Sequence, residues 1–264
     1  MSTLHHLPSE GQIAKQIRQI FFPLGIRCPK CRRRYDYKIQ GRYFCKKCRL
    51  KFSKKRCTPF AHSKLSEKQL WFLLSAWLAQ LSPQDTRGIT GLSYPTIHRW
   101  FVRFSKLLPD FSPVLGGTVE VDEAFIGKKK YDNQTVVLGA IARDSGQIAV
   151  RAVLGREQGD SDRFILDHVR PASLICTDAN PNYDHLPEFF GYGHEVCNHG
   201  MGHFGPTNRV ENVWMRLRRF IRKVYHHVWK EHLPRLLKEF QARVNQPEVF
   251  ATPISFLSYV FQVS

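Results

Sequence analysis

Three carboxylates occupy positions where acidic residues are unusual. Asp122 lies in the strand-like run TVEVDEAFIG, Asp178 ends the apolar run SLICTDAN, and Glu211 lies in the basic stretch TNRVENVWMRLRRFIRKVYHHV. Three carboxylates that meet at a sheet edge can hold two divalent cations, which activate an attacking oxygen and stabilise a leaving one in phosphoryl transfer. Each acid also has a structural explanation: an edge strand for Asp122, a turn or cap for Asp178, and an ion pair for Glu211.

The stretch around Glu211 is otherwise cationic, and an acid weakens a surface that attracts polyanions. An ion pair along the helix is a weak explanation, because Trp214 and Met215 occupy the positions three and four residues later. Glu211 and Arg218 are two helical turns apart and share a face. Glu211 could therefore bind a metal ion, and Arg218 a phosphate, at the same nucleotide. The remaining cations would bind the flanking DNA backbone: Arg209, Arg216, Arg219, Arg222 and Lys223.

A second group of residues with metal-ligand spacing lies near the N-terminus. Cys28 and Cys31 form one C-x-x-C pair, and Cys45 and Cys48 form another. Four thiolates in two such pairs can close a tetrahedral zinc shell, and the segment between them predicts a short hairpin that turns at Gln40-Gly41. The sequence therefore predicts a zinc ribbon, with reduced structural cysteines as the alternative. Residues 27–56 hold fourteen cations and one acid, which favours nucleic-acid backbone contact over a merely solvated face.

Composition indicates the class of partner. The 264 residues include 40 Lys and Arg against 22 Asp and Glu, a net charge of +18. Such a basic chain typically binds nucleic acid, because the phosphates that it neutralises release their counterions and this release favours binding. An anionic membrane surface is the alternative partner. No apolar run reaches the roughly 18 residues that span a bilayer, and the N-terminus lacks the charged-then-apolar pattern of a signal peptide. We therefore expect an intracellular protein without a membrane partner, whose cysteines stay reduced.

Three regions differ in composition, and they predict three domains: 1–60, a zinc ribbon; 61–110, a helical DNA-binding region; and 111–264, a catalytic domain. The last region begins within the Pro/Gly-rich LPDFSPVLGG, after which four strand-like runs follow, with a helical candidate, SDRFILDHV, between the last two. Helical patterns follow at about 207–227 and 231–245. This order predicts a mixed α/β sheet. Strand alternation puts Glu120 and Asp122 on one face and Glu123 on the other.

The pattern of helix starts and ends in the middle region is typical of a helix-turn-helix. One helix is expected to end near GLS, and another to begin at Tyr94-Pro95 with Ser93 as its N-cap. Thr96, His98 and Arg99 would face outward, which makes Arg99 a candidate DNA contact. The apolar side would consist of Leu92, Ile97, Trp100 and Phe101. An ordinary helical hairpin is the alternative.

Together these motifs resemble the bacterial and archaeal insertion-sequence transposases (ISXO-type) that join a zinc ribbon to an RNase H-like DDE domain. The resemblance covers nearly the whole chain and rests on the two C-x-x-C pairs and on three blocks, VEVDEAFIG, TDANPNY and TNRVENVWMRLR. It implies an α/β, RNase H-like mixed sheet flanked by helices, with catalytic residues Asp122, Asp178 and Glu211. Asn208 in the last block is a second candidate for the third metal ligand. The family-typical Lys of that block is Arg218 here.

The resemblance also implies a reaction and partners. Water would attack the phosphodiester at a transposon end to free a 3′-hydroxyl, which would then attack target DNA. Mg or Mn would bind the carboxylates and structural zinc the cysteines, in a cytoplasmic, prokaryotic homo-oligomer on double-stranded DNA. His199 and His203, just before the last block, would be loop residues with structural hydrogen bonds, or would contact DNA or tune the metal site. A catalytically inactive, domesticated descendant that only binds DNA is the alternative, and a nuclease without strand transfer is another.

Overall fold

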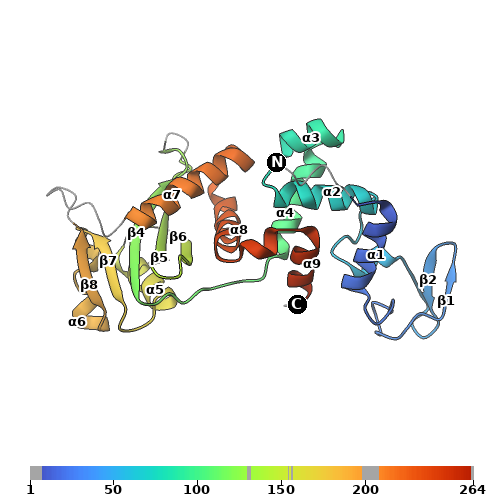
Figure 1. The fold of residues 1–264 in the computed structure, drawn as a ribbon, viewed down its shortest axis with the longest axis horizontal. Coiled ribbons are helices and arrows are strands. Elements are labelled where there is room, and N and C mark those ends of the chain that lie inside the picture. Colours follow the sequence, from blue (N-terminus) through green and yellow to red (C-terminus); the bar gives the residue numbers. More distant parts are fainter. Residues whose placement is uncertain (1–7, 130–131, 154, 156, 198–207, 263–264) are drawn as a thin grey trace. The chain divides into compact units, whose positions relative to one another are not determined.

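The computed structural model describes residues 8–129, 132–153, 155, 157–197 and 208–262. The chain forms two compact units, Met1–Pro109 together with Glu248–Ser264, and Asp110–Pro247 (Figure 1). The last helix, α9 (Pro253–Gln262), thus belongs to the first unit, whereas the composition of the sequence groups it with the second. The division into three domains stays a prediction. None of the described helices is long and apolar enough to cross a membrane.

The first unit begins with α1 (Glu10–Phe21) and a small three-stranded sheet. Its strands are β1 (Tyr37–Ile39), β2 (Arg42–Cys45) and β3 (Leu50–Phe52), all antiparallel in the order β1-β2-β3. The predicted hairpin at Gln40-Gly41 is present, and both turn residues have positive φ, 48° and 74°. A two-residue turn of this kind matches the twist of the strands that it joins.

Three helices follow in the first unit, α2 (Glu67–Leu78), α3 (Pro83–Thr90) and α4 (Tyr94–Leu107). Ser66 and Ser82 begin the first two with reciprocal capping boxes, and Gly91 ends α3 in the left-handed conformation, φ 67°. The predicted break between α3 and α4 is confirmed. Ser93 is the N-cap of α4, but its hydroxyl contacts the Thr96 hydroxyl at 2.9 Å and makes no capping hydrogen bond.

The faces of α4 follow the predicted pattern in most positions. Ile97, Trp100 and Phe101 are buried, and Leu92 is half-buried in the turn. Arg99 is exposed, as expected, whereas Thr96 and His98 are half-buried. The two helices and the turn between them are therefore present, and their identity as a DNA-binding helix-turn-helix stays a prediction.

The second unit is built on a five-stranded mixed sheet in the order β6-β5-β4-β7-β8. The strands are β4 (Thr118–Ile126), β5 (Thr135–Ala142), β6 (Ile148–Val153), β7 (Leu174–Asp178) and β8 (Gly193–Cys197). β4, β5 and β6 pair antiparallel, while β7 lies parallel between β4 and β8. The helices are α5 (Gln158–His168), α6 (Leu186–Phe190), α7 (Asn208–Phe220) and α8 (Leu233–Asn245). This sheet flanked by helices confirms the predicted α/β fold class.

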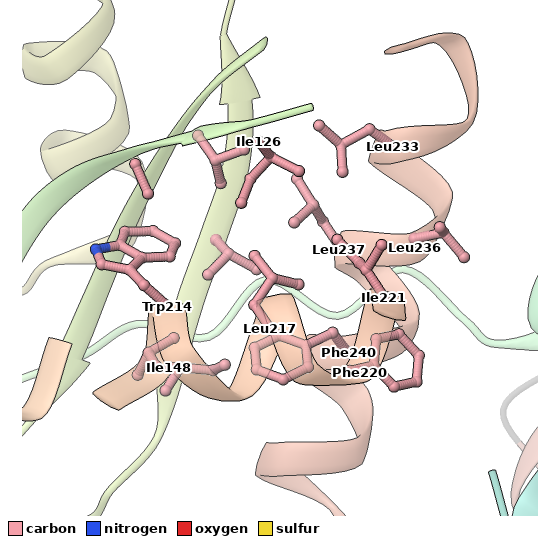
Figure 2. Close-up of a cluster of buried hydrophobic side chains, with 14 of the residues drawn as sticks. Ile126, Ile148, Trp214, Leu217, Phe220, Ile221, Leu233, Leu236, Leu237 and Phe240 are labelled. Carbon is pink, nitrogen blue, oxygen red and sulfur yellow. The ribbon is translucent and has the colours of Figure 1, made fainter. Parts of the chain in front are cut away.

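Each face of the sheet has its own apolar core. α7 and α8 cover the face that carries Ala124 and Ile126 of β4, and α5 covers the face that carries Val119 and Val121 (Figure 1). Figure 2 shows Trp214 at one end of the first core, with its indole nitrogen directed away from the other labelled side chains. α7 continues as a π-helical turn, Ile221–Tyr225, so the helix predicted at about 207–227 is not a uniform α-helix.

Amide side chains of α8 cover the outer edge of β6. Asn245 accepts from the Ile148 backbone N–H and donates to its carbonyl, both at 2.8 Å. Gln241 accepts from the Val150 N–H at 2.9 Å. These bonds satisfy backbone groups that an edge strand would otherwise present to another chain.

Candidate active site

The strand β4 directs two acids toward α7. Glu120 and Asp122 lie on the same face as Ala124 and Ile126, as predicted. Glu123 is on the other face, where its Oε1 accepts from the Asn180 amide at 2.9 Å. Alternation along one strand therefore sends neighbouring carboxylates to different surroundings.

Asp122 and Asp178 lie at corresponding positions of two neighbouring parallel strands. β4 and β7 pair in parallel from Thr118 with Leu174 to Glu120 with Cys176, and Asp122 and Asp178 each lie two residues beyond the last of these pairs. Neighbouring strands are about 4.8 Å apart, so the two carboxylates come from adjacent strands of the sheet. The negative charge of Asp178 accordingly contributes to a raised pKa at Asp122.

Trp214 of α7 holds Asp122 in place. Its indole Nε1 donates a hydrogen bond to Asp122 Oδ2 at 2.8 Å. Burial raises the pKa of Asp122, the bond from Trp214 opposes this, and the charges of Asp178 and Glu123 raise the pKa further. The Asp122 carboxylate is therefore largely shielded from water and lies near the negative charges of Asp178 and Glu123. A bound cation would offset these charges.

A glycine makes room for the indole ring. Gly139 of β5 is the register partner of Asp122, and a Cβ at Gly139 would lie 2.3 Å from Trp214 Cη2. Any larger residue would push the ring away from the sheet. Gly139 thus allows α7 to approach closely enough for Trp214 to reach Asp122.

Glu120 fixes the start of α7. Its side chain is only 1% exposed, and its Oε2 accepts from the backbone N–H groups of Arg209 at 2.8 Å and Val210 at 3.0 Å. The other oxygen, Oε1, accepts from Arg143 Nε at 2.9 Å. A carboxylate at a helix N-terminus satisfies free N–H groups and complements the helix dipole. Glu120 is therefore the anchor that sets the position of α7 over Asp122.

Glu211 is exposed on the first turn of α7, one turn before Trp214. Asn208, the other candidate ligand, is exposed at the start of the same helix. Within the described part of the chain, only four cysteines bring three or more ligand atoms within 4.8 Å of one another. Asp122, Asp178 and Glu211 are therefore spaced more widely than the ligands of a single ion. His199 and His203 lie outside the described residues.

Six of the seven predicted DNA-binding cations, all except Arg99, lie on the outer side of α7 and its π-helical extension. All of them are exposed: Arg209, Arg216, Arg218, Arg219, Arg222 and Lys223. The inner side of the same helix is apolar, because Val210, Val213, Trp214 and Leu217 are buried. α7 therefore presents positive charge outward while its packed side contributes Trp214 to the site.

The four cysteines of the small sheet form a compact cluster. The Sγ atoms of Cys28, Cys31, Cys45 and Cys48 all lie within 4.8 Å of one another, and those of Cys31 and Cys45 are 3.6 Å apart. Four sulfurs around a tetrahedral zinc, each at about 2.3 Å, would be separated by about 3.8 Å. A hydrogen bond from the Arg33 backbone, with smaller contributions from the other cysteines, lowers the pKa of Cys31 to about 7.

Two equivalent backbone turns present these sulfurs. The residue after each pair, Arg32 or Arg49, has a positive φ, 60° or 50°. Asp36, the single acid between residues 27 and 56, accepts from the Lys46 N–H at 2.7 Å and so supports the second turn. The acid in this basic segment therefore has a structural role.

Comparison with protein families identifies the chain. A sequence model of the ISXO2-like transposase domain matches residues 114–245, which is half of the chain. The chain belongs to the ISXO2-like transposase family. A model of the transposase zinc-ribbon domain matches residues 8–51 of the same chain. The resemblance seen in the sequence is thereby confirmed, and the family gives this chain a transposase role.

The chain is also similar to individual proteins. An uncharacterized protein in transposable element ISH50 of Halobacterium salinarum is 27% identical over 93% of both chains. Among solved structures, the HTLV-2 integrase catalytic core domain in complex with magnesium has a TM-score of 0.36 at 12% identity, over 52% of this chain and 89% of its own. The BIV integrase catalytic core domain has a TM-score of 0.36 at 14% identity, over 50% and 84%.

Three residues of this transposase that surround Asp122 were not among the predicted site residues: Glu120, Gly139 and Trp214. Glu120 had a signal in the sequence, since it shares the inward face of the strand with Asp122. For Trp214 the sequence shows only that it lies three residues after Glu211. The contacts of Glu120 and Trp214 with their partners span about ninety residues of chain, which local patterns do not reveal.

Proposed function

We propose that this transposase cuts DNA at the ends of its insertion sequence and joins the freed 3′-hydroxyl to target DNA. The observation that carries the proposal is that Asp122 and Asp178, from neighbouring parallel strands, interact electrostatically, and that Asp122 also contacts α7, the helix that carries Glu211. In the first step water forms a bond to phosphorus, and the bond to the 3′-oxygen breaks. In the second step that 3′-hydroxyl attacks a target phosphodiester and displaces its 3′-oxygen.

The acidic residues suit a pair of divalent cations. Asp122 and Asp178 repel each other in a partly buried setting, and a cation between or beside them would offset that repulsion. Magnesium or manganese held by Asp122, Asp178 and Glu211 would activate the attacking oxygen and stabilise charge on the leaving one. Asn208 is the other candidate for the third position.

The remaining residues of the site act by position and charge. Trp214 orients the Asp122 carboxylate, and Glu120 keeps the start of α7 against the sheet. The exposed cations of α7 and its extension would hold the phosphates on either side of the reacting one. A reacting phosphate would thus lie beside Asp122, while the neighbouring phosphates would contact the exposed cations of α7.

The N-terminal unit would recognise the transposon ends. Cys28, Cys31, Cys45 and Cys48 would hold one structural zinc, since their spacing fits a tetrahedral thiolate shell. The exposed Arg99 on α4 would contact double-stranded DNA of the terminal inverted repeats. Reaction at two ends needs at least two protomers, so a homo-oligomer on DNA is proposed, acting in the cytoplasm of a prokaryotic cell.

The test is cleavage of a duplex that carries the inverted repeat of the element. With Mg²⁺, we expect discrete nicks at the repeat end from the wild-type protein and none from Asp122→Asn, which keeps an oxygen that can accept from Trp214. Asp167→Asn removes an exposed acid on α5 and should leave cleavage unchanged. Tight binding without cleavage in Mg²⁺ or Mn²⁺ would instead indicate an inactive, DNA-binding descendant. Joining of the product to a plasmid separates a transposase from a nuclease.

A further inference from the structure

A cavity of about 610 Å³ lies beside the far end of β4, within the second unit. Phe125 and Lys128 contribute one wall, Arg218 and Arg222 another, and His226 and Trp229 a third. The size falls within the range of pockets that hold small organic ligands. None of the described residues that line it is acidic. The cavity therefore combines aromatic surfaces with positive charge, which suits a nucleotide.

The tryptophan of this cavity is unusual among those of the chain. Trp229 is 53% exposed, whereas the other four tryptophans, Trp71, Trp77, Trp100 and Trp214, are at most 7% exposed. Phe125, in the same cavity, is 43% exposed. Large aromatic side chains left in solvent beside cations are the usual platforms for unpaired bases. The core does not explain the position of Trp229.

The backbone around Trp229 is held in place. Asn133 donates from its side-chain amide to the Val228 carbonyl and accepts from the Lys230 N–H, both at 2.7 Å. Asn133 thus clamps the chain on both sides of Trp229. Gly127 allows the backbone of Asn133 to approach closely, because a Cβ at position 127 would lie 1.9 Å from the Asn133 carbonyl oxygen. Trp229 is therefore presented to solvent by a built support.

The segment that leads into Trp229 is conformationally strained. The π-helical turn Ile221–Tyr225 follows α7, and His226 has φ 60° and ψ −47°. π-helical turns and unfavourable backbone angles in residues other than glycine concentrate at functional sites. Here they carry the chain from Arg222, on one wall of the cavity, to Trp229 on another.

The cavity lies close to the proposed active site. Phe125 is three residues along β4 from Asp122, about 10 Å, and Arg218 is seven residues along α7 from Glu211, also about 10 Å. This separation corresponds to about three nucleotide steps along one strand of duplex DNA. A strand whose reacting phosphate lies at Asp122 would thus reach the cavity a few nucleotides away.

We propose that this cavity binds an unpaired base of the DNA substrate, stacked on Trp229, with its phosphates held by Arg218, Arg222 and Lys128. The inference rests on the proposed function for the identity of the substrate strand. Binding of a base that has left its pair would help to open the duplex next to the reacting phosphate. The energy for unpairing would come from stacking and from the phosphate contacts.

The test compares two short duplexes of the same sequence, one blunt and one with a single-stranded overhang of a few nucleotides. Binding is measured by fluorescence anisotropy at fixed salt, with no divalent cation and no chelator added, so that cleavage does not occur and zinc stays bound. We expect Trp229→Ala to weaken binding of the overhang duplex between about 5-fold and about 150-fold, and the blunt duplex less than about 2-fold. Trp229→Phe should retain most of the affinity. Leu166→Ala removes another half-exposed apolar side chain, on α5, and should change neither affinity.

A fluorescent base analogue in the overhang supplies a second readout. Its emission should be quenched on binding to the wild type and to Trp229→Phe, but not to Trp229→Ala. Equal losses for both duplexes, or no loss for either, would overturn the proposal. These measurements need no catalysis. A protein that shows the overhang preference but never cleaves would contradict the proposed function and leave the cavity proposal standing.

Discussion

Replacement of Glu120 by alanine should loosen the start of α7. In the wild type, the buried carboxylate accepts two backbone N–H bonds from Arg209 and Val210 and one bond from Arg143. Removal of one partner of a buried, hydrogen-bonded ion pair typically costs about 3–5 kcal/mol. Unlike a surface acid, Glu120 is 1% exposed, so water cannot replace it without rearrangement. We therefore expect the substitution to lower the local free energy of unfolding by an amount near the upper end of the range for single substitutions.

A second ion pair of the same length provides the control. Arg151 and Asp167 are also 2.9 Å apart, but their side chains are 34% and 46% exposed. Exposed pairs contribute about 0–1 kcal/mol, so Asp167→Asn should have little effect. Glu120→Gln keeps an oxygen that can accept from the helix but loses the charge that faces Arg143. It should therefore fall between the wild type and Glu120→Ala.

Hydrogen exchange is the suitable assay, because the protein has two compact units and its global unfolding need not be two-state. The amides of Arg209 and Val210 report on the bonds that the substitution removes. A loss of about 3 kcal/mol corresponds to exchange about 150-fold faster at these amides. If Glu120→Ala and Asp167→Asn changed their exchange equally, the anchoring role of Glu120 would be wrong.

Three further predictions concern other parts of the molecule. Gly139→Ala should cost about 1–3 kcal/mol and abolish Mg²⁺-dependent cleavage, because its Cβ would displace Trp214, whereas Gly159→Ala, with open space around it, should do neither in the same assays. Cys45→Ser should lower bound zinc, measured by metal analysis of the purified protein, from one equivalent per chain to a small fraction, and should unfold the ribbon. Burial lowers the pKa of His168 from 6.5, so its neutral form stabilises the fold above that pH, and stability in urea should fall as the pH drops below about 6.5 toward the lowered value. His168→Gln should remove this part of the pH dependence, and an unchanged profile would contradict the assignment.

Much of the fold follows from local patterns in the sequence. The alternation in TVEVDEAFIG predicts β4 and the faces of its acids, and Gln40-Gly41 predicts the turn of the ribbon hairpin. The break between α3 and α4 is also local, since Gly91 ends one helix just before Ser93 begins the next. Each of these features depends on residues a few positions apart, and such interactions are encoded in short windows of sequence.

Other features depend on contacts that no short window contains. The π-helical turn Ile221–Tyr225 interrupts a stretch whose composition predicts continuous helix. α9 follows the second unit in sequence but packs in the first, where Phe256 lies against Trp77 at 5.1 Å between ring centroids. Gly139 is one glycine in an apolar strand, and only the approach of Trp214 gives it a specific role. Tertiary packing decides all three.

The three acids of β4 illustrate why residue type alone does not define a site. Glu120, Asp122 and Glu123 lie within four positions, yet one anchors a helix, one receives the Trp214 indole, and one faces Asn180 on the opposite side of the sheet. Alternation separates Glu123 from the other two, but Glu120 and Asp122 share a face and differ only in what α7 brings to them. At Glu120, Oε2 accepts from two N–H groups at the start of α7, and Oε1 accepts from the charged Arg143. At Asp122 the donors are the Trp214 indole and the Glu123 backbone N–H, which are both neutral, and Asp178 adds a negative charge nearby. A cation would therefore be drawn to Asp122 rather than to Glu120, because only there does the fold leave negative charge that the protein itself does not balance.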